Sequence, residues 1–134
     1  MRRILLRIAA FLVLFTCAGH TYGTFVPIPS DQTEMIKTLE QMKATMIPMP
    51  MGSSKSYSQI LDGNNLSVAV YLLVTGLILL ALSRNRPAVD NTVLLITSGG
   101  LGLVAGLSAV YFFPLPAICT GAAAVLGFVA AKAA

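Results

Sequence analysis

Two long uncharged runs, separated by a short basic loop, constrain this chain more than any other feature. Residues 66–83 (LSVAVYLLVTGLILLALS) and residues 92–113 (TVLLITSGGLGLVAGLSAVYFF) contain no Asp, Glu, Lys or Arg. Because a membrane-spanning helix needs about 20 predominantly apolar residues, each run has the length of a span. Only 10% of the chain is charged, whereas a typical soluble domain carries about 25% charge. The sequence therefore predicts an all-α membrane protein built around a transmembrane helical hairpin.

A third apolar segment follows the hairpin at residues 117–131 (AICTGAAAVLGFVAA). Pro114 and Pro116 separate it from the second run, since proline lacks the amide donor that a helix interior needs. The segment is short and has few large apolar side chains, so its insertion is weaker than that of the two runs before it. We expect a short third transmembrane helix, which makes 66–134 a helical bundle. A re-entrant half-helix and a continuation of a kinked second helix are the alternatives.

The first 23 residues have the pattern of a secretory signal peptide. Arg2 and Arg3 make a basic start, residues 8–18 form an apolar core, and small residues follow. We expect cleavage after Gly23, with Gly19 as the rival site. An uncleaved membrane anchor is the alternative interpretation of residues 1–23.

Residues 24–65 form the one long polar segment, and they predict a short amphipathic helix over 31–45. Asp31 and Glu34 have the spacing of a capping box, in which a side chain at the start of a helix accepts a hydrogen bond from a first-turn amide. Five apolar residues recur at helical spacing. They are Met35, Ile36, Leu39, Met42 and Met46. We expect this apolar face to contact a partner protein or the membrane surface, or to fold against the chain's own bundle.

The rest of this polar segment predicts a connection between the amphipathic helix and the first span. Residues 52–56 (GSSKS) have the composition of a flexible linker. Residues 62–65 (DGNN) predict a turn that caps the first membrane helix.

The basic loop predicts the orientation of the hairpin. Arg84 and Arg86 follow the first span directly, and loops rich in Lys and Arg stay on the cytoplasmic side of a membrane. Loop 84–91 is then cytoplasmic and segment 24–65 is extracytoplasmic.

Small residues spaced four apart predict where the membrane helices pack. Ser98, Gly102 and Gly106 repeat along the second span, and Ala123 and Gly127 do so along the third segment. Small residues at this spacing let two helix backbones come close, and close packing is what holds helices together in lipid.

The sequence contains no arrangement typical of catalysis, and we expect no enzyme activity, cofactor or metal site. The predicted spans hold no Asp, Glu, Lys, Arg or His, so proton relay within the membrane has no candidate carrier. The net charge is +4, but three of the positive residues belong to the signal-like segment, so nucleic-acid binding is not indicated. Cys17 and Cys119 both lie in apolar stretches, which indicates neither a disulfide framework nor a metal site.

The order of these features resembles the pilin family of conjugative and type IV secretion systems, and the small inner-membrane proteins encoded with such systems. The features are the signal-like segment, the extracytoplasmic lead, the first span, the Arg-containing loop and the glycine-rich second span. The resemblance implies a subunit of a bacterial inner membrane that assembles with other membrane subunits, with the basic loop between the two helices facing a tube lumen. Segment 117–131 and the long lead are additions to that pattern. A structural subunit of another membrane complex and a holin-like pore former are the alternative functions.

Overall fold

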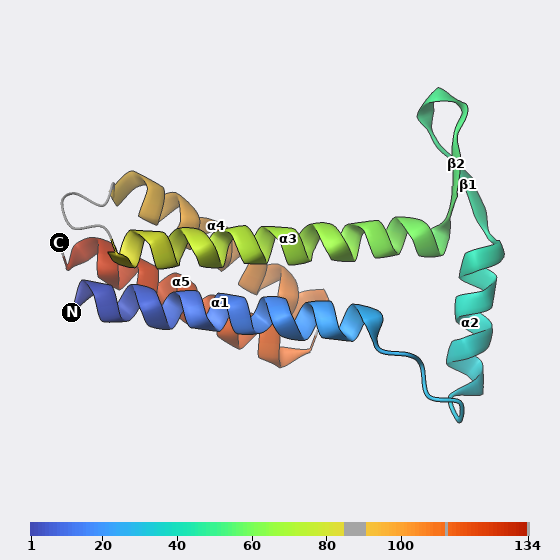
Figure 1. Ribbon diagram of the computed structural model, residues 1–134, viewed down its shortest axis with the longest axis horizontal. Coiled ribbons are helices and arrows are strands. Elements are labelled where there is room, and N and C mark those ends of the chain that lie inside the picture. Colours follow the sequence, from blue (N-terminus) through green and yellow to red (C-terminus); the bar gives the residue numbers. More distant parts are fainter. Residues whose placement is uncertain (85–90, 112, 134) are drawn as a thin grey trace. The chain divides into compact units, whose positions relative to one another are not determined.

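The computed structural model describes residues 1–84, 91–111 and 113–133, which form five α-helices and one small β-hairpin (Figure 1). In chain order the elements are α1 (Arg2–Phe25), α2 (Thr33–Ala44), β1 (Met46–Pro48), a 3₁₀ turn η1 (Pro50–Gly52), β2 (Ser54–Ser56), α3 (Tyr57–Arg84), α4 (Asn91–Tyr111) and α5 (Pro114–Lys132). Helices α1, α3, α4 and α5 are each long and apolar enough to cross a membrane. The all-α class is thus confirmed, and four such helices indicate a membrane protein.

The chain divides into two compact units. Unit 1 comprises Met1–Gly19 and Val70–Ala134, and unit 2 comprises His20–Ala69. Unit 1 therefore holds most of α1, the second half of α3, and all of α4 and α5. Unit 2 holds α2 and the β-hairpin.

The helices of unit 1 bury one narrow stripe each. The buried residues are Leu6, Ala9, Ala10, Val13 and Thr16 on α1, Leu72, Gly76, Leu79 and Ser83 on α3, Leu94, Ser98, Leu101 and Ser108 on α4, and Cys119, Thr120, Ala123, Ala124, Gly127, Ala130 and Ala131 on α5. On α3 the buried positions alternate steps of four and three residues. Helices that bury such stripes cross at about 20°, as in coiled coils and most membrane bundles.

Helices α4 and α5 form an antiparallel pair. Ser98 faces Gly127 and Ala105 faces Gly121, so residue numbers rise along one helix as they fall along the other. Phe113 between them is extended, with φ −82° and ψ 163°. The idea that 117–131 continues a kinked second helix is therefore wrong.

Unit 2 contains a two-stranded antiparallel hairpin in which Met46 pairs with Ser56 and Pro48 with Ser54. At its tip Met51 has φ 64° and Gly52 has φ 75°. Both values are in the left-handed region, which Gly adopts freely and which costs an ordinary residue about 1 kcal/mol. Residues 52–56 thus belong to the turn and to β2, and the expected flexible linker is wrong.

Helix α3 begins at Tyr57, so the expected turn at 62–65 is also wrong. The reason is an unpredicted capping box at Ser56 and Gln59. The Ser56 amide donates to Gln59 Oε1 (3.0 Å) and the Gln59 amide donates to Ser56 Oγ (3.2 Å). These two reciprocal bonds satisfy amides that a helix start leaves without partners, and the helix runs on through Gly63.

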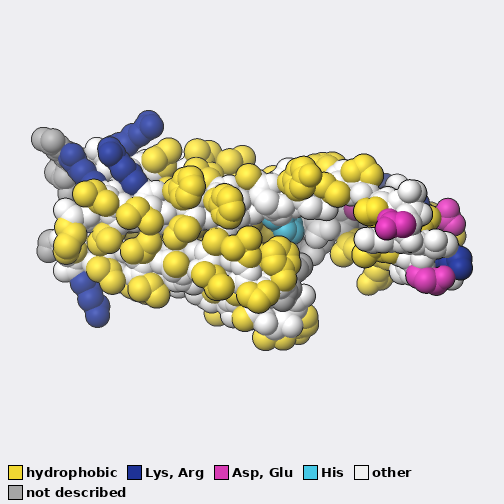
Figure 2. Space-filling view, turned by 90° about the horizontal axis from the view of Figure 1, so that it is seen from below, with side chains coloured by type: hydrophobic (Ala, Val, Ile, Leu, Met, Phe, Trp, Pro, Cys, Tyr) yellow, Lys and Arg dark blue, Asp and Glu magenta, His cyan; other side chains and the backbone are white. Residues whose placement is uncertain are grey.

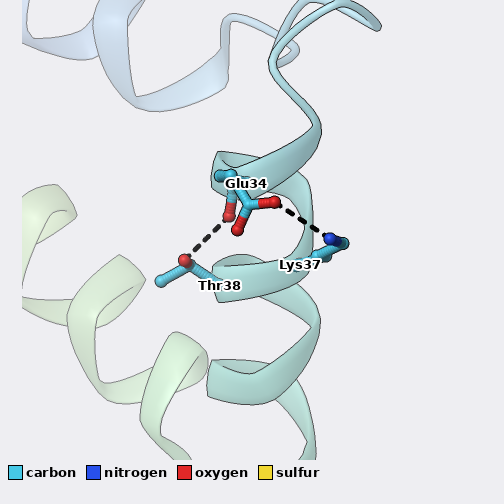
Figure 3. Close-up of polar contacts among 3 residues, drawn as sticks. All are labelled: Glu34, Lys37 and Thr38. Carbon is cyan, nitrogen blue, oxygen red and sulfur yellow. Dashed lines mark hydrogen bonds and ion pairs between the residues drawn. The ribbon is translucent and has the colours of Figure 1, made fainter.

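Helix α2 begins at Thr33, two residues later than the expected Asp31. Its N-cap is Gln32, which makes no side-chain capping bond, so the capping box expected between Asp31 and Glu34 is wrong. The Glu34 carboxylate instead accepts from Lys37 Nζ at 2.9 Å, and Thr38 Oγ1 donates to the Glu34 carbonyl at 2.9 Å (Figure 3). These contacts join neighbours one turn apart on the exposed surface of the helix.

Candidate functional site

The candidate site is a set of helix surfaces. Among the residues that the structure describes, no group of three or more His, Cys, Asp or Glu side chains could hold a metal ion. Some of these surfaces are covered within the bundle, and others are open.

Two of the predicted packing residues, Ser98 and Gly127, meet in the α4–α5 pair. Ser98 is fully buried and its hydroxyl donates to the Leu94 carbonyl at 2.7 Å. A Cβ atom at Gly127 would overlap Ser98 Oγ and lie 3.2 Å from Ser98 Cβ. Ala123 is fully buried one turn earlier on α5. Gly127 is thus the point where the absence of a side chain lets α5 approach α4 closely.

Helix α5 buries a polar side chain whose hydroxyl is satisfied within its own helix. Thr120 is fully buried, and its hydroxyl donates to the Pro116 carbonyl at 2.7 Å. In lipid this hydrogen bond is stabilising, because no water is present to bond to an unsatisfied polar group.

Gly102 and Gly106 lie outside the α4–α5 contact. Both are exposed, and a Cβ atom added at either would have nothing within 4 Å. Ser98 and these two glycines therefore do not share one partner inside the chain. The glycine face, defined as Gly102 and Gly106, is a smooth strip on the outer surface of α4. Packing of this strip against another helix stays a prediction.

A second close approach, between α1 and α3, was not predicted. A Cβ at Gly76 would lie 2.6 Å from Leu14 Cδ2 and 3.6 Å from the Ala10 carbonyl oxygen. The Leu14 side chain thus occupies the space above Gly76. The repeat rule could not find Gly76, because Leu72 and Leu80 stand four residues on either side of it.

The positive charges of unit 1 gather at one end. Arg2 Nη2 donates to Asn91 Oδ1 at 2.8 Å, so α1 and α4 begin at the same end of the unit. Arg84, which closes α3, is joined to Asn91 by only six residues, and α5 returns to this end because it runs antiparallel to α4. Figure 2 shows dark-blue side chains grouped at the left end of the view. The basic end consists of Arg2, Arg3, Arg7, Arg84 and Lys132.

The described part of unit 1 contains no Asp or Glu to offset this charge. Arg84 is exposed, while Arg86, the other predicted loop cation, lies outside the described residues. Among the described residues, the charged side chains of the basic end are therefore all positive.

The apolar face expected on the amphipathic helix is divided between two elements. Met35, Ile36, Leu39 and Met42 lie on α2, whereas Met46 lies on β1. No residue of α2 is buried. Ile36, Leu39 and Met42 are half-buried, and Met35 and Met46 are both 55% exposed.

No family model, curated protein or solved structure matches this chain.

Proposed function

We propose that this chain is a small multi-pass membrane subunit of a larger assembly. The observation that carries the proposal is the open glycine face of α4. Apolar surfaces do not drive helices together in lipid, because the acyl chains are equally apolar, so association depends on close packing. Gly127 lets α5 come close to α4 within this chain. Gly102 and Gly106 would let a helix of a second chain come equally close to α4.

The basic end supports an orientation for the subunit. Cations at the ends of membrane helices stay on the cytoplasmic side, which makes loop 84–91 cytoplasmic. Segment 24–65 joins the other ends of α1 and α3, so it is extracytoplasmic.

We further propose that residues 1–23 are retained as an anchor. Leu6, Ala9 and Val13 are at most 1% exposed within unit 1, and Leu14 covers Gly76. Cleavage after Gly23 would remove these contacts. The packing of α1 thus supports the anchor over the cleaved signal peptide, and a chain with four spans places both of its ends in the cytoplasm.

The assembly that we propose first is a conjugative or type IV secretion apparatus of a bacterial inner membrane, with this chain as a pilin-like or associated component. The support is the resemblance in the order of spans and basic loop, with Arg84 at the cytoplasmic end of α3. A structural subunit of another complex and a holin-like pore former are the alternatives. Neighbouring genes for transfer ATPases would favour the first, and lysis enzymes would favour the pore former.

The apolar side of α2 gives the proposed subunit an extracytoplasmic contact. Ile36, Leu39 and Met42 lie on one side of this helix, with charged Lys37 and Glu40 elsewhere on it. We propose that this side contacts a partner subunit or the membrane surface. Methionine suits either contact, because its unbranched side chain adapts to irregular surfaces.

The decisive experiment places bulk on the glycine face. We expect Gly102→Leu to insert normally but to lower the crosslinked multimer of membrane-embedded protein roughly tenfold, since overpacking costs about 1–3 kcal/mol. Electron microscopy of the wild-type multimer would then show whether it is a filament.

Gly100→Leu is the matched control. Gly100 is also exposed and open, but it lies about 200° around α4 from Gly102, because each residue turns a helix by about 100°. Equal multimer yields from wild type and Gly102→Leu would refute the proposal. Equal loss in both variants would show that the effect is not specific to the glycine face.

A further inference from the structure

The outer surface of α1 combines exposed cations with exposed aromatic rings. Arg3 and Arg7 are both exposed. Phe11 is 66% exposed and Phe15 50% exposed. Residues four apart in a helix are neighbours on one side, so these four side chains form a continuous column, which we call the α1 column. Most of the buried residues of α1 lie on the other side of the helix.

The two halves of the α1 column suit different depths of a bilayer. Arg3 and Arg7 belong to the basic end of unit 1, which the orientation proposed above places at the cytoplasmic headgroups. Phe11 and Phe15 follow about 6 and 12 Å further along the helix axis than Arg7, at 1.5 Å per residue. That depth is occupied by acyl chains. The two rings stack with centroids 6.3 Å apart and present one continuous apolar surface.

We propose that the α1 column binds one anionic phospholipid, with its phosphate at Arg3 and Arg7 and an acyl chain along Phe11 and Phe15. Charge complementarity selects the anionic headgroup, because the described part of unit 1 carries cations at this end and no carboxylate. Guanidinium groups are also well shaped for phosphate, to which they can donate paired hydrogen bonds. The inference rests on the proposed retention of α1 and on the proposed orientation.

The test is native mass spectrometry of the full-length protein in mild detergent, titrated with phosphatidylglycerol or with phosphatidylcholine of the same acyl chains. We expect wild type to retain phosphatidylglycerol preferentially. Arg3→Gln together with Arg7→Gln should lower that preference by roughly 5- to 30-fold, since each cation near an anionic membrane surface contributes a factor of about five. Arg3→Lys with Arg7→Lys should restore most of it, because the charges remain.

Two further double variants test whether lipid retention depends on the α1 column or only on the protein's net positive charge. Phe11→Ala with Phe15→Ala should reduce retention of phosphatidylglycerol while leaving every charge in place. Lys37→Gln with Lys43→Gln, which removes two cations from α2, should leave the preference unchanged. Equal retention of the two lipids by wild type would overturn the proposal, and so would a preference that the α2 variant abolishes.

The remaining outcomes distinguish the possible causes of failure. Displacement of the lipid by millimolar inorganic phosphate would show a site for free anions instead of a lipid site. The same spectra report the mass of the chain. A chain that begins at Thr24 would refute both the retention of α1 and the lipid site. An intact chain without lipid preference would refute the lipid site alone.

Discussion

The α4–α5 pair and the α1–α3 pair use opposite packing solutions within one unit. Every side chain that α5 buries is small, and the types are Cys, Thr, Ala and Gly. The buried stripes of α1 and α3 instead include Leu6, Val13, Leu72 and Leu79. Both pairs have a glycine at a tight contact, but Gly127 on α5 meets the short side chain of Ser98, whereas Gly76 on α3 receives the end of Leu14.

This difference shows two ways to hold helices together where lipid removes the hydrophobic drive. In the α4–α5 pair the side chains that α5 buries are all small, so a larger side chain at Gly127 would overlap Ser98. On α1 and α3 large apolar side chains are buried within unit 1, so removing one of them leaves a cavity. The pairs should therefore respond oppositely to larger and smaller residues.

The largest expected effect is that of Gly127→Leu, which should cost about 3 kcal/mol, the upper end for overpacking. The new side chain would be forced into Ser98 and the α4 backbone. Disulfide trapping in a cysteine-free background measures the effect. A Cβ at Gly121 lies 3.6 Å from Ala105 Cβ, which is within the range for a disulfide.

Cysteines at positions 105 and 121 should therefore crosslink in the parent and fail to do so in Gly127→Leu. Gly106→Cys with Gly121→Cys is the control pair and should not link, since Gly106 has no neighbour within 4 Å. Undiminished trapping in Gly127→Leu would mean that the two backbones do not depend on that glycine.

Removal of bulk should be costly in the other pair. Leu79 is fully buried, whereas Leu77 on the same helix is 50% exposed. We expect Leu79→Ala to lower the free energy of unfolding by about 2 kcal/mol through the cavity that it leaves. Leu77→Ala should change it by less than about 0.5 kcal/mol. Denaturant titration in detergent, followed by circular dichroism, would check both, and similar values for the two variants would contradict the packing described for α3.

The smallest expected effect is that of Gly76→Ala, about 1 kcal/mol. The new methyl group meets the end of Leu14, a flexible side chain, so Leu14→Ala should remove the overlap, and the double variant should lose less stability than the sum of the two single losses. In the α4–α5 pair, Ser98→Ala should rescue Gly127→Ala only in part, because Ser98 Cβ itself lies 3.2 Å from the new atom. Double-mutant cycles measure both couplings. Equal rescue in the two pairs would remove the distinction between them.

The sequence alone predicted the elements whose signal is local in the chain. Run 66–83 lies within α3, and run 92–113 covers most of α4. Ser98 and Gly127 meet in a helix contact, and Ala123 is buried. The start of α3 was mispredicted because DGNN is a strong turn signal. The capping box at Ser56 and Gln59 was equally visible, and it starts the helix earlier.

The contacts that escaped prediction depend on the register between two helices. Gly76 has large neighbours at four-residue spacing, so only its alignment with Leu14 reveals it as a contact. Gly102 and Gly106 show the converse. Their spacing matches a packing motif, but the register of α5 places Ser98 in the contact and leaves the two glycines outside it. Small-residue spacing thus identifies candidate surfaces without identifying their partners.

The gathering of Arg2, Arg3, Arg7, Arg84 and Lys132 at one end also has an electrical consequence. Moving one elementary charge across a membrane potential of 100 mV changes its free energy by about 2.3 kcal/mol. In the orientation that we propose, inverting the bundle would carry five cations outward against an inside-negative potential, at a cost of roughly 11 kcal/mol. That is comparable to the folding free energy of a whole small domain. An energised membrane would therefore hold this subunit in one orientation, and an assembly built from it would receive every copy facing the same way.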